Sequence, residues 1–285
     1  MASPLALPIG ETAVLDALRL DAQPLHGGDG DYDALLELVG DARLVLLGEA
    51  SHGTHEFYRE RARITRRLIE ERGFTAVAVE GDWPDADRVS RYLQGFGDDA
   101  DAEEALRGFQ RFPTWMWRNA EVLDFVGWLR AHNEQPAPAR RSVGFYGLDL
   151  YSLGASMEAV VAYLQEVDPA GAVRARRRYE CLHPFSGDSA GYGQAVLLGV
   201  SEPCRRRVLE QLVELRRHAG DYLRSDGLVA EDRYFLAEQN ATVVADAEEY
   251  YRTMFAGPAP SWNLRDRHMA DTLDQLQVHL ARHGD

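Results

Sequence analysis

The sequence predicts an α/β domain in which a parallel or mixed central sheet is flanked by helices, with a large helical C-terminal half. Three short apolar segments, residues 43–47, 75–79 and the weaker 142–146, carry apolar side chains at consecutive positions. Such runs are typical of strands buried on both faces of a parallel sheet. Helical patterns separate the three segments, and this alternation indicates an α/β fold. Beyond Asp149, only helical patterns follow.

Residues 1–40 form a lead-in, and residues 41–285 form the predicted domain. Three glycines between positions 27 and 30 interrupt the lead-in, and residues 32–39 carry a short amphipathic helical pattern. The remaining predicted helices span residues 54–72, 84–93, 115–132, 153–167, 172–181, 203–223, 229–254 and 263–283, where apolar residues recur at helical spacing. Three strands are few for so many helices, so we expect an incomplete sheet.

Composition excludes several classes of function. A domain of 285 residues buries roughly 75% of its unfolded surface and needs no disulfide or metal for stability. The formal charge of -15 disfavours binding to nucleic acid or to an anionic membrane surface. Lysine does not occur, which excludes Schiff-base chemistry and a P-loop. The arginine-rich segments 174–178 and 205–207 are interpreted as solvated helix faces, because glutamates lie close by.

Cysteine use and the N-terminus favour a cytoplasmic protein. Cys181 and Cys204 are far apart and form no CxxC motif, so reduced thiols are the default expectation and a thiolate metal site is disfavoured. Pro4 and Pro8 interrupt an N-terminus that lacks the pattern of a signal peptide. No apolar run approaches the roughly 18 residues of a membrane-spanning helix.

Acidic residues follow each predicted strand. Glu49 comes after the first strand, Glu80 and Asp82 after the second, and Asp149 after the third. Ligands of parallel α/β sheets bind beyond the carboxyl ends of the strands, so these side chains are expected in one cleft with His52. For Asp82, a purely structural alternative is a helix cap ahead of Pro84.

His52 lies just before the helix that Thr54 is expected to cap. The positive end of that helix favours a neutral imidazole, which can act as a general base. A capping role without chemistry is the alternative.

Two other interpretations use the same loop. Ser51 resembles a nucleophile only superficially, because Glu49 replaces the first glycine of G-x-S-x-G, whereas His52 and His55 with nearby acids provide a possible metal site.

Arg61 occupies the apolar stripe of the predicted helix 54–72. It shares one helix face with Phe57, Ile64 and Leu68. A guanidinium on a buried face requires a carboxylate partner, for which Glu80 and Glu49 are the candidates. The alternative is that Arg61 extends past the stripe to water.

Aromatic residues gather between the second and third predicted strands. Phe109, Phe112, Trp115 and Trp117 are interpreted as core residues, although they provide an alternative lining for a large apolar pocket.

Three sequence segments resemble the erythromycin esterase family. They are LLGEASHGTHEF at residues 46–57 with Arg61 after it, VEGDW at residues 79–83, and SWNLRDRHM at residues 261–269. The resemblance extends over roughly residues 40–280. It implies an α/β fold with an extensive helical part and an activity that hydrolyses a carboxylic ester or a macrolide-type lactone, as in antibiotic resistance.

Carried over to this sequence, the family's general base is His52, its motif acids are Glu49 and Glu80, and its motif arginine is Arg61. In this scheme His52 deprotonates the attacking water, Glu49 orients the imidazole, and Arg61, held by Glu80, stabilises the oxyanion. We assign Asp82, Asp149 and Arg265 to substrate binding. No metal or cofactor is expected, the partner is a small ester or lactone, and the sequence leaves the oligomeric state open.

The resemblance is incomplete at the C-terminus. Family members continue into another strand that ends in Ala-His-Asn-x-His, whereas this chain ends at Asp285. Residues 131–133 read Ala-His-Asn, but they end a predicted helix and Gln135 replaces the second histidine. We therefore expect a C-terminally truncated domain with an incomplete cleft. Three hypotheses remain at this point: a metal-independent hydrolase, a metal-dependent hydrolase that uses the same residues, and a truncated domain without catalytic activity.

Overall fold

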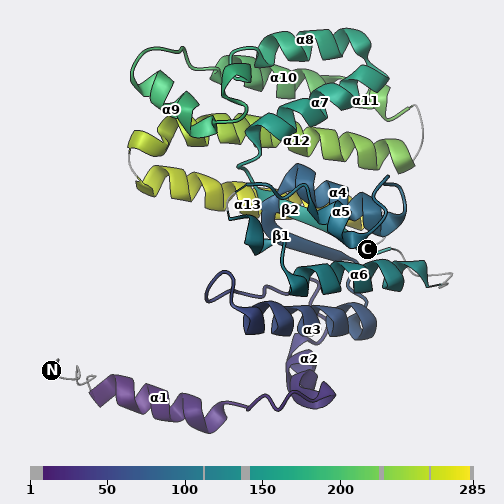
Figure 1. Cartoon of the computed structure of the whole chain (residues 1–285), viewed down its shortest axis with the longest axis vertical. Coiled ribbons are helices and arrows are strands. Elements are labelled where there is room, and N and C mark those ends of the chain that lie inside the picture. The colour runs from purple at the N-terminus through teal and green to yellow at the C-terminus, as the bar shows by residue number, and fades with distance from the viewer. Residues whose placement is uncertain (1–8, 112, 136–141, 225–227, 257, 283–285) are drawn as a thin grey trace.

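The computed structural model describes residues 9–111, 113–135, 142–224, 228–256 and 258–282. A small parallel sheet lies in the middle of the molecule, with helices on either side (Figure 1). The elements of the N-terminal half are α1 (Ile9–Asp21), α2 (Asp33–Val39), α3 (His55–Arg72), β1 (Ala76–Asp82), α4 (Trp83–Gln94), α5 (Ala102–Leu106), α6 (Ala120–Glu134) and β2 (Gly144–Asp149), with short 3-10 helices at Asp29–Tyr32 and Thr114–Met116.

The C-terminal half is helical, as predicted. Its helices are α7 (Leu153–Val167), α8 (Pro169–Tyr179), α9 (Ser189–Leu197), α10 (Arg205–Arg217), α11 (Ala219–Tyr222), α12 (Leu228–Thr253) and α13 (Pro258–Arg282), with 3-10 helices at His183–Phe185 and Met254–Ala256. The long helix α12 packs against α7, α9, α10 and α13, and α13 in turn contacts β2. Thus α12 and α13 connect the helical half to the sheet (Figure 1).

The sheet of the described residues has two strands, not three. β1 and β2 run parallel, from Ala76 opposite Gly144 to Asp82 opposite Asp149, with an irregularity between Val79 and Asp82. The prediction of a strand at residues 43–47 is wrong, because that segment pairs with neither strand and the Leu46 side chain is exposed. A strand needs a neighbour for its backbone groups, and an apolar run alone does not provide one.

Two large apolar clusters form the core. One lies among α3, α4, α6 and the sheet, and the other lies among the helices from α7 to α12. A third, smaller cluster contains Trp83 of α4, Phe235 of α12 and Leu276 of α13. In the described part of the chain, no helix has both the length and the apolar character required to cross a bilayer.

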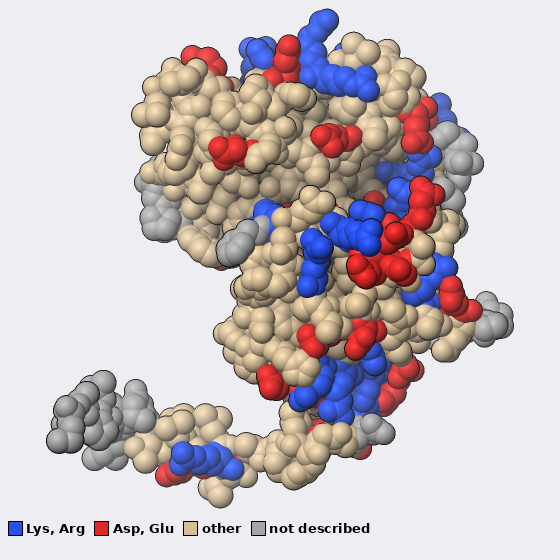
Figure 2. All heavy atoms as spheres, viewed as in Figure 1, with Lys and Arg blue, Asp and Glu red and all other residues tan. Residues whose placement is uncertain are grey.

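Most predicted helices are present, with shifted ends. α3 starts directly after Thr54 and is closed by Gly73, whose φ of 72° is the left-handed conformation that glycine adopts readily. The predicted helix 203–223 is divided into α10 and α11. The lead-in contains an additional helix, α1, which stands away from the body of the molecule with Leu18 and Leu20 exposed (Figures 1 and 2).

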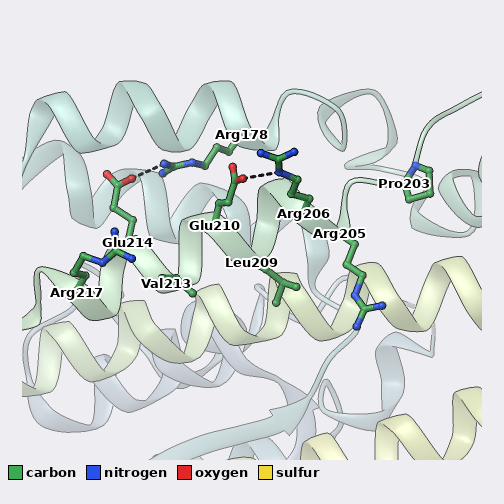
Figure 3. A pocket seen from close by; sticks show the side chains of 9 residues that line it. All are labelled: Arg178, Pro203, Arg205, Arg206, Leu209, Glu210, Val213, Glu214 and Arg217. Carbon is green, nitrogen blue, oxygen red and sulfur yellow. Dashed lines mark hydrogen bonds and ion pairs between the residues drawn. The ribbon is translucent and has the colours of Figure 1, made fainter.

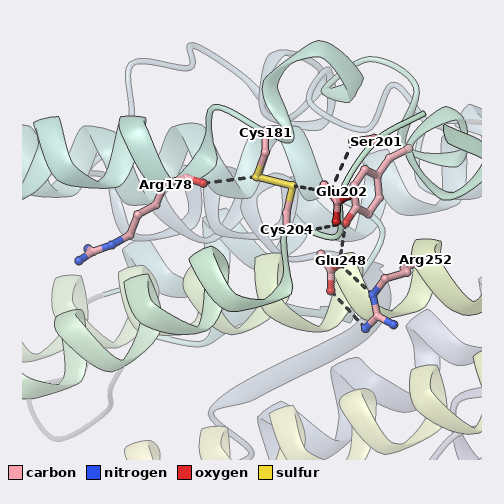
Figure 4. The surroundings of a disulfide bond; sticks show 8 residues. Arg178, Cys181, Ser201, Glu202, Cys204, Glu248 and Arg252 are labelled. Carbon is pink, nitrogen blue, oxygen red and sulfur yellow. Dashed lines mark hydrogen bonds and ion pairs between the residues drawn. A yellow bond between two sulfur atoms is a disulfide. The ribbon is translucent and has the colours of Figure 1, made fainter. Parts of the chain in front are cut away.

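The two cysteines form a disulfide, contrary to the expectation of reduced thiols. Cys181 follows α8 and Cys204 precedes α10, and their Cα atoms are 6.2 Å apart, within the range that a disulfide spans (Figure 4). The backbone N–H of Cys204 donates to the Tyr192 hydroxyl at 2.9 Å, and that hydroxyl donates to Glu248 at 2.6 Å. The packing of the helices brings the two residues together, which their separation of 23 residues does not reveal.

Candidate active site

The loop before α3 holds His52 and Glu49 next to Arg61. Nδ1 of His52 lies 3.3 Å from Oε2 of Glu49, and Nη1 of Arg61 donates to the same oxygen at 3.1 Å. Arg61 is thus partly buried, with 24% of its side chain exposed, and its guanidinium lies over the Tyr58 ring. The prediction that Arg61 pairs with Glu49 or Glu80 is confirmed for Glu49.

Tyr58 completes this group from the first turns of α3. Its hydroxyl and Oε1 of Glu49 are both buried. Burial of the phenol raises the pKa of Tyr58, the charge of Glu49 raises it further, and the Gly53 backbone opposes the rise. The Tyr58 hydroxyl therefore stays protonated.

A pocket of about 360 Å³ opens beside the loop. It is lined by His52, Gly53, His55, Tyr58, Trp115, Asn119 and Glu121. Gly53 has a φ of 76°, and a Cβ at this position would lie 2.7 Å from the Trp115 ring. Glycine thus allows the loop to pass directly over the indole, which forms an apolar surface inside the pocket.

A second polar group lies at the carboxyl ends of the strands. Arg265 of α13 binds Asp149 with two hydrogen bonds, from Nε at 3.0 Å and from Nη2 at 2.7 Å, and Nη2 also donates to Glu80. Asp149 is almost completely buried, with 2% of its side chain exposed. A buried carboxylate requires such a partner, so Arg265 fixes α13 to the end of the sheet.

Arg111 extends this second group towards solvent. Its Nε donates to Asp82 at 3.0 Å, Nη2 lies 3.8 Å from Asp149, and its guanidinium stacks over Tyr151. Burial raises the pKa of Asp82, and the charge of Arg111 opposes that rise. Oδ1 of Asp82 is buried without a partner. Sequence reasoning missed Arg111, because it lies in a loop whose sequence carries no pattern.

The residues that were expected in a single cleft therefore form two separate polar groups, one around Glu49 and one around Arg265. His52 lines the 360 Å³ pocket and contacts Glu49, which binds Arg61 behind it. Glu80, Asp82, Asp149 and Arg265 do not line this pocket and form the second group around Arg265. The expectation that Glu80 holds Arg61 is wrong. Glu80 is the fifth residue of β1 and faces α13, so Arg265 neutralises it, while Arg61 faces the loop before its own helix.

The structure also places the residues of the alternative interpretations of the loop. The Ser51 hydroxyl is 2.6 Å from that of Thr54, within hydrogen-bond distance. Across the described ranges, no cluster of three or more His, Cys, Asp or Glu side chains has the arrangement to hold a metal ion. Phe109 and Trp117 are packed with the core, as expected, whereas Trp115 borders the pocket and Phe112 lies outside the described residues.

A larger groove of about 660 Å³ lies on the outer face of α10 (Figure 3). Its apolar residues are Leu209 and Val213, and its charged residues include the ion pairs Arg178–Glu214 and Arg206–Glu210. These arginines are paired, as expected for solvated helix faces. None of the predicted site residues lines this groove.

Comparison with known proteins decides the family. The family model of erythromycin esterase matches residues 69–285, which is most of the chain. The chain belongs to the erythromycin esterase family. The matched region contains Glu80, Asp82, Asp149 and Arg265, and it begins after Glu49, His52 and Arg61.

Relatives and solved structures agree with this membership. Erythromycin esterase type II of Escherichia coli is 30% identical over 142 residues, or 48% of this chain and 32% of the relative. A putative hydrolase of Bacillus subtilis (strain 168) is 23% identical over 52% of this chain and 32% of the relative. These matches cover about a third of the curated relatives.

Two solved structures show the same fold. One is a Bacillus cereus protein, with a TM-score of 0.75, 21% identity, and coverage of 96% of this chain and 64% of the other. The second is an erythromycin esterase mutant in its open conformation, with a TM-score of 0.65, 21% identity, and coverage of 91% and 62%. The helix-rich α/β architecture is therefore that of the erythromycin esterase family.

Proposed function

We propose that this chain is a hydrolase of carboxylic esters or lactones in which His52 activates water without a metal ion. The observation that carries the proposal is the contact of His52 with Glu49 at the edge of a pocket. Contact through Nδ1 leaves Nε2 as the nitrogen that accepts a proton from water. Glu49 orients the ring and stabilises the imidazolium that forms, as carboxylates do in other histidine-based hydrolases.

Arg61 and Tyr58 supply the positive and donor groups of this site. Arg61 holds Glu49 and brings a fixed positive charge to the loop. Tyr58 lines the pocket, and we assign its protonated hydroxyl as a donor to the oxyanion that forms when water attacks the carbonyl. The names of the relatives make a macrolide lactone the substrate to test first, and such an activity leads to antibiotic resistance.

We further propose that Glu80 supports the site from the sheet side, and that Asp82, Asp149 and Arg265 take part in substrate binding. Arg111, which has 43% of its side chain exposed, is the member of this group that a substrate reaches most easily. Its guanidinium is placed to donate hydrogen bonds to a carbonyl or hydroxyl of the substrate.

The test is hydrolysis of a p-nitrophenyl ester and of erythromycin by the chain and by its His52→Gln variant. Loss of a general base lowers the rate by about 10²–10⁴-fold. The control is His218→Gln, which removes an exposed histidine that pairs with Asp221 and lines neither pocket described above. Equal rates for the wild type and His52→Gln would contradict the proposal, as would absence of turnover by the wild type.

A chelator tests the proposed metal independence. Turnover should be unchanged by EDTA at concentrations that inactivate a zinc hydrolase measured in parallel. Loss of activity that added Zn²⁺ or Mn²⁺ restores would favour a metal-dependent hydrolase instead.

A further inference from the structure

The pocket beside the loop contains a second histidine–carboxylate pair. His55 is the first residue of α3, and its Nδ1 is hydrogen-bonded to the carboxylate of Glu121 in the first turn of α6. His55 and Glu121 line the same 360 Å³ pocket as His52. Each imidazole thus contacts a carboxylate through Nδ1, and in each ring Nε2 is the nitrogen left for a ligand.

Hydrolysis of an alkyl ester needs both a base and an acid. A base removes a proton from the attacking water, and an acid protonates the leaving alcohol, because an alkoxide is a poor leaving group. Two histidines at one pocket can divide these tasks, provided that one is neutral and the other is charged at the start of the reaction.

The surroundings of the two histidines differ. Glu49, the partner of His52, is also bound by Arg61, so this carboxylate is shared between an imidazole and a guanidinium. Glu121, the partner of His55, comes from α6 and has no arginine within ion-pair distance among the described residues. The two imidazoles therefore reach one pocket from different supports, and each can act on a different atom of a bound ester.

We propose that His55 is the general acid that protonates the leaving alcohol, which deepens the proposed function and rests on it. Water attacks the carbonyl carbon and gives a proton to Nε2 of His52. When the tetrahedral intermediate collapses, the bond between carbon and the alcohol oxygen breaks, and the electron pair remains on that oxygen. The oxygen takes the proton from Nε2 of His55. His52 then loses its proton to water, His55 regains one, and the products are the carboxylic acid and the alcohol.

The His55–Glu121 pair differs from a local surface ion pair. Exposed ion pairs contribute little to stability, and the chain contains a local one in His218 and Asp221 on a single helical turn. His55 and Glu121 instead belong to two helices that meet at the pocket. The His55 side chain is 57% exposed, so its ring is open to a ligand, whereas Glu121, which holds the ring, is only 17% exposed.

The experiment compares two esters of one acid, a p-nitrophenyl ester and an ethyl ester, with wild type, His55→Gln, Glu121→Gln and the control His218→Gln. The p-nitrophenolate leaves without protonation, whereas the ethoxide needs the acid. His55→Gln should lower kcat/KM for the ethyl ester by about 10²–10⁴-fold and change the p-nitrophenyl ester rate less than about threefold. Glu121→Gln should also lower kcat/KM for the ethyl ester, but by a smaller factor. His218→Gln should leave kcat/KM unchanged for both esters.

The outcomes separate this inference from the function on which it rests. Equal losses on both esters in His55→Gln would show that His55 has a structural role or acts on the attack step, and would overturn the inference. Unchanged rates on both esters would also overturn it. Failure of the wild type to hydrolyse either ester would contradict the proposed function itself, and this inference with it. Imidazole added to His55→Ala should restore the ethyl ester rate selectively, and equal stimulation of both esters would contradict the assignment.

Discussion

Arg61 and Glu49 form an ion pair that ties α3 to the loop before it, with Nη1 of the arginine 3.1 Å from Oε2 of the glutamate. The same oxygen lies 3.3 Å from Nδ1 of His52. One carboxylate therefore bridges a guanidinium and an imidazole. The position of His52 depends on an arginine two turns into the helix.

Removal of the Arg61 guanidinium should destabilise the fold. Arg61→Met keeps the aliphatic part of the side chain and leaves the charge of Glu49 without its partner. Removal of one partner of a fully buried ion pair lowers the free energy of unfolding by about 3–5 kcal/mol. Because the Arg61–Glu49 pair is partly exposed, we expect a decrease of about 2 kcal/mol, measured by urea unfolding. The control is Arg59→Met on the same helix, where loss of the exposed pair with Glu60 should change the stability much less. Equal losses in the two variants would contradict the role of the pair.

Removal of Arg265 should have the larger effect on stability. Arg265→Met leaves Glu80 and the buried Asp149 without their guanidinium partner, which costs about 3–5 kcal/mol. Arg267→Met, two residues along α13 and exposed, is the matched control and should change stability by less than about 0.5 kcal/mol. Unfolding in guanidinium chloride, followed by circular dichroism, measures the stability of both variants. A small effect of Arg265→Met would contradict the role of Arg265 as the connection between α13 and the sheet.

Local patterns predict α3 well and the sheet poorly. The helical spacing of apolar residues predicts the bounds of α3 because that information lies within the segment. It is less accurate for the buried face, which carries Tyr58, Leu68 and Ile69, whereas Phe57 is exposed. Thr54 precedes the helix, but its side chain makes no capping hydrogen bond. Residues 43–47 have the composition of a buried strand, but a strand also needs a neighbour, and that depends on distant segments.

The candidate site shows the same limit. His52, Glu49 and Arg61 are close in sequence, so the pattern is sufficient to place them together. The partner of Glu80 is 185 residues away, on a helix whose position follows only from the packing of the helical half. His55 is visible in the sequence, but the carboxylate that gives it a chemical role comes from α6.

Gly53 and Gly73 permit a test of the loop that carries His52. Both have positive φ, but a Cβ at Gly73 meets nothing within 4 Å, whereas a Cβ at Gly53 would overlap Trp115. Gly73→Ala should therefore lower the stability by about 1–2 kcal/mol, which is the energy needed to hold alanine in the left-handed conformation. Gly53→Ala should cost more, because the loop must also move away from the indole, and His52 moves with it.

The readouts for this pair of glycines are thermal unfolding and ester hydrolysis. We expect Gly53→Ala to lower kcat/KM by about 100-fold, in line with a displacement of about 1 Å at the reacting groups, and Gly73→Ala to leave it close to wild type. The double variant Gly53→Ala/Trp115→Ala should regain part of the stability, because only the overlap is removed and the φ strain remains. No recovery would show that Trp115 is not the obstacle.

Asp85 should make stability depend on pH. Burial raises the pKa of Asp85 to about 7, and the neighbouring charge of Asp82 contributes to the rise. In the unfolded chain its pKa is about 3.9, so between these values the folded state binds more protons than the unfolded state. The stability that Asp85 contributes is therefore fully present below about pH 4 and is lost as the pH rises through about 7. Because Asp85 is partly accessible, we expect a loss of about 2 kcal/mol.

Asp85→Asn removes this titration and keeps the shape of the side chain. The variant should match the wild type near pH 4 and exceed its stability by about 2 kcal/mol at pH 8, in urea unfolding at a series of pH values. Asp87, with a pKa raised by burial to about 6, should give both proteins a common decline at lower pH. The control Asp98→Asn changes an exposed carboxylate beyond α4 and should follow the wild-type curve. Parallel curves for wild type and Asp85→Asn from pH 5 to 8 would show that Asp85 is already ionised in the folded state.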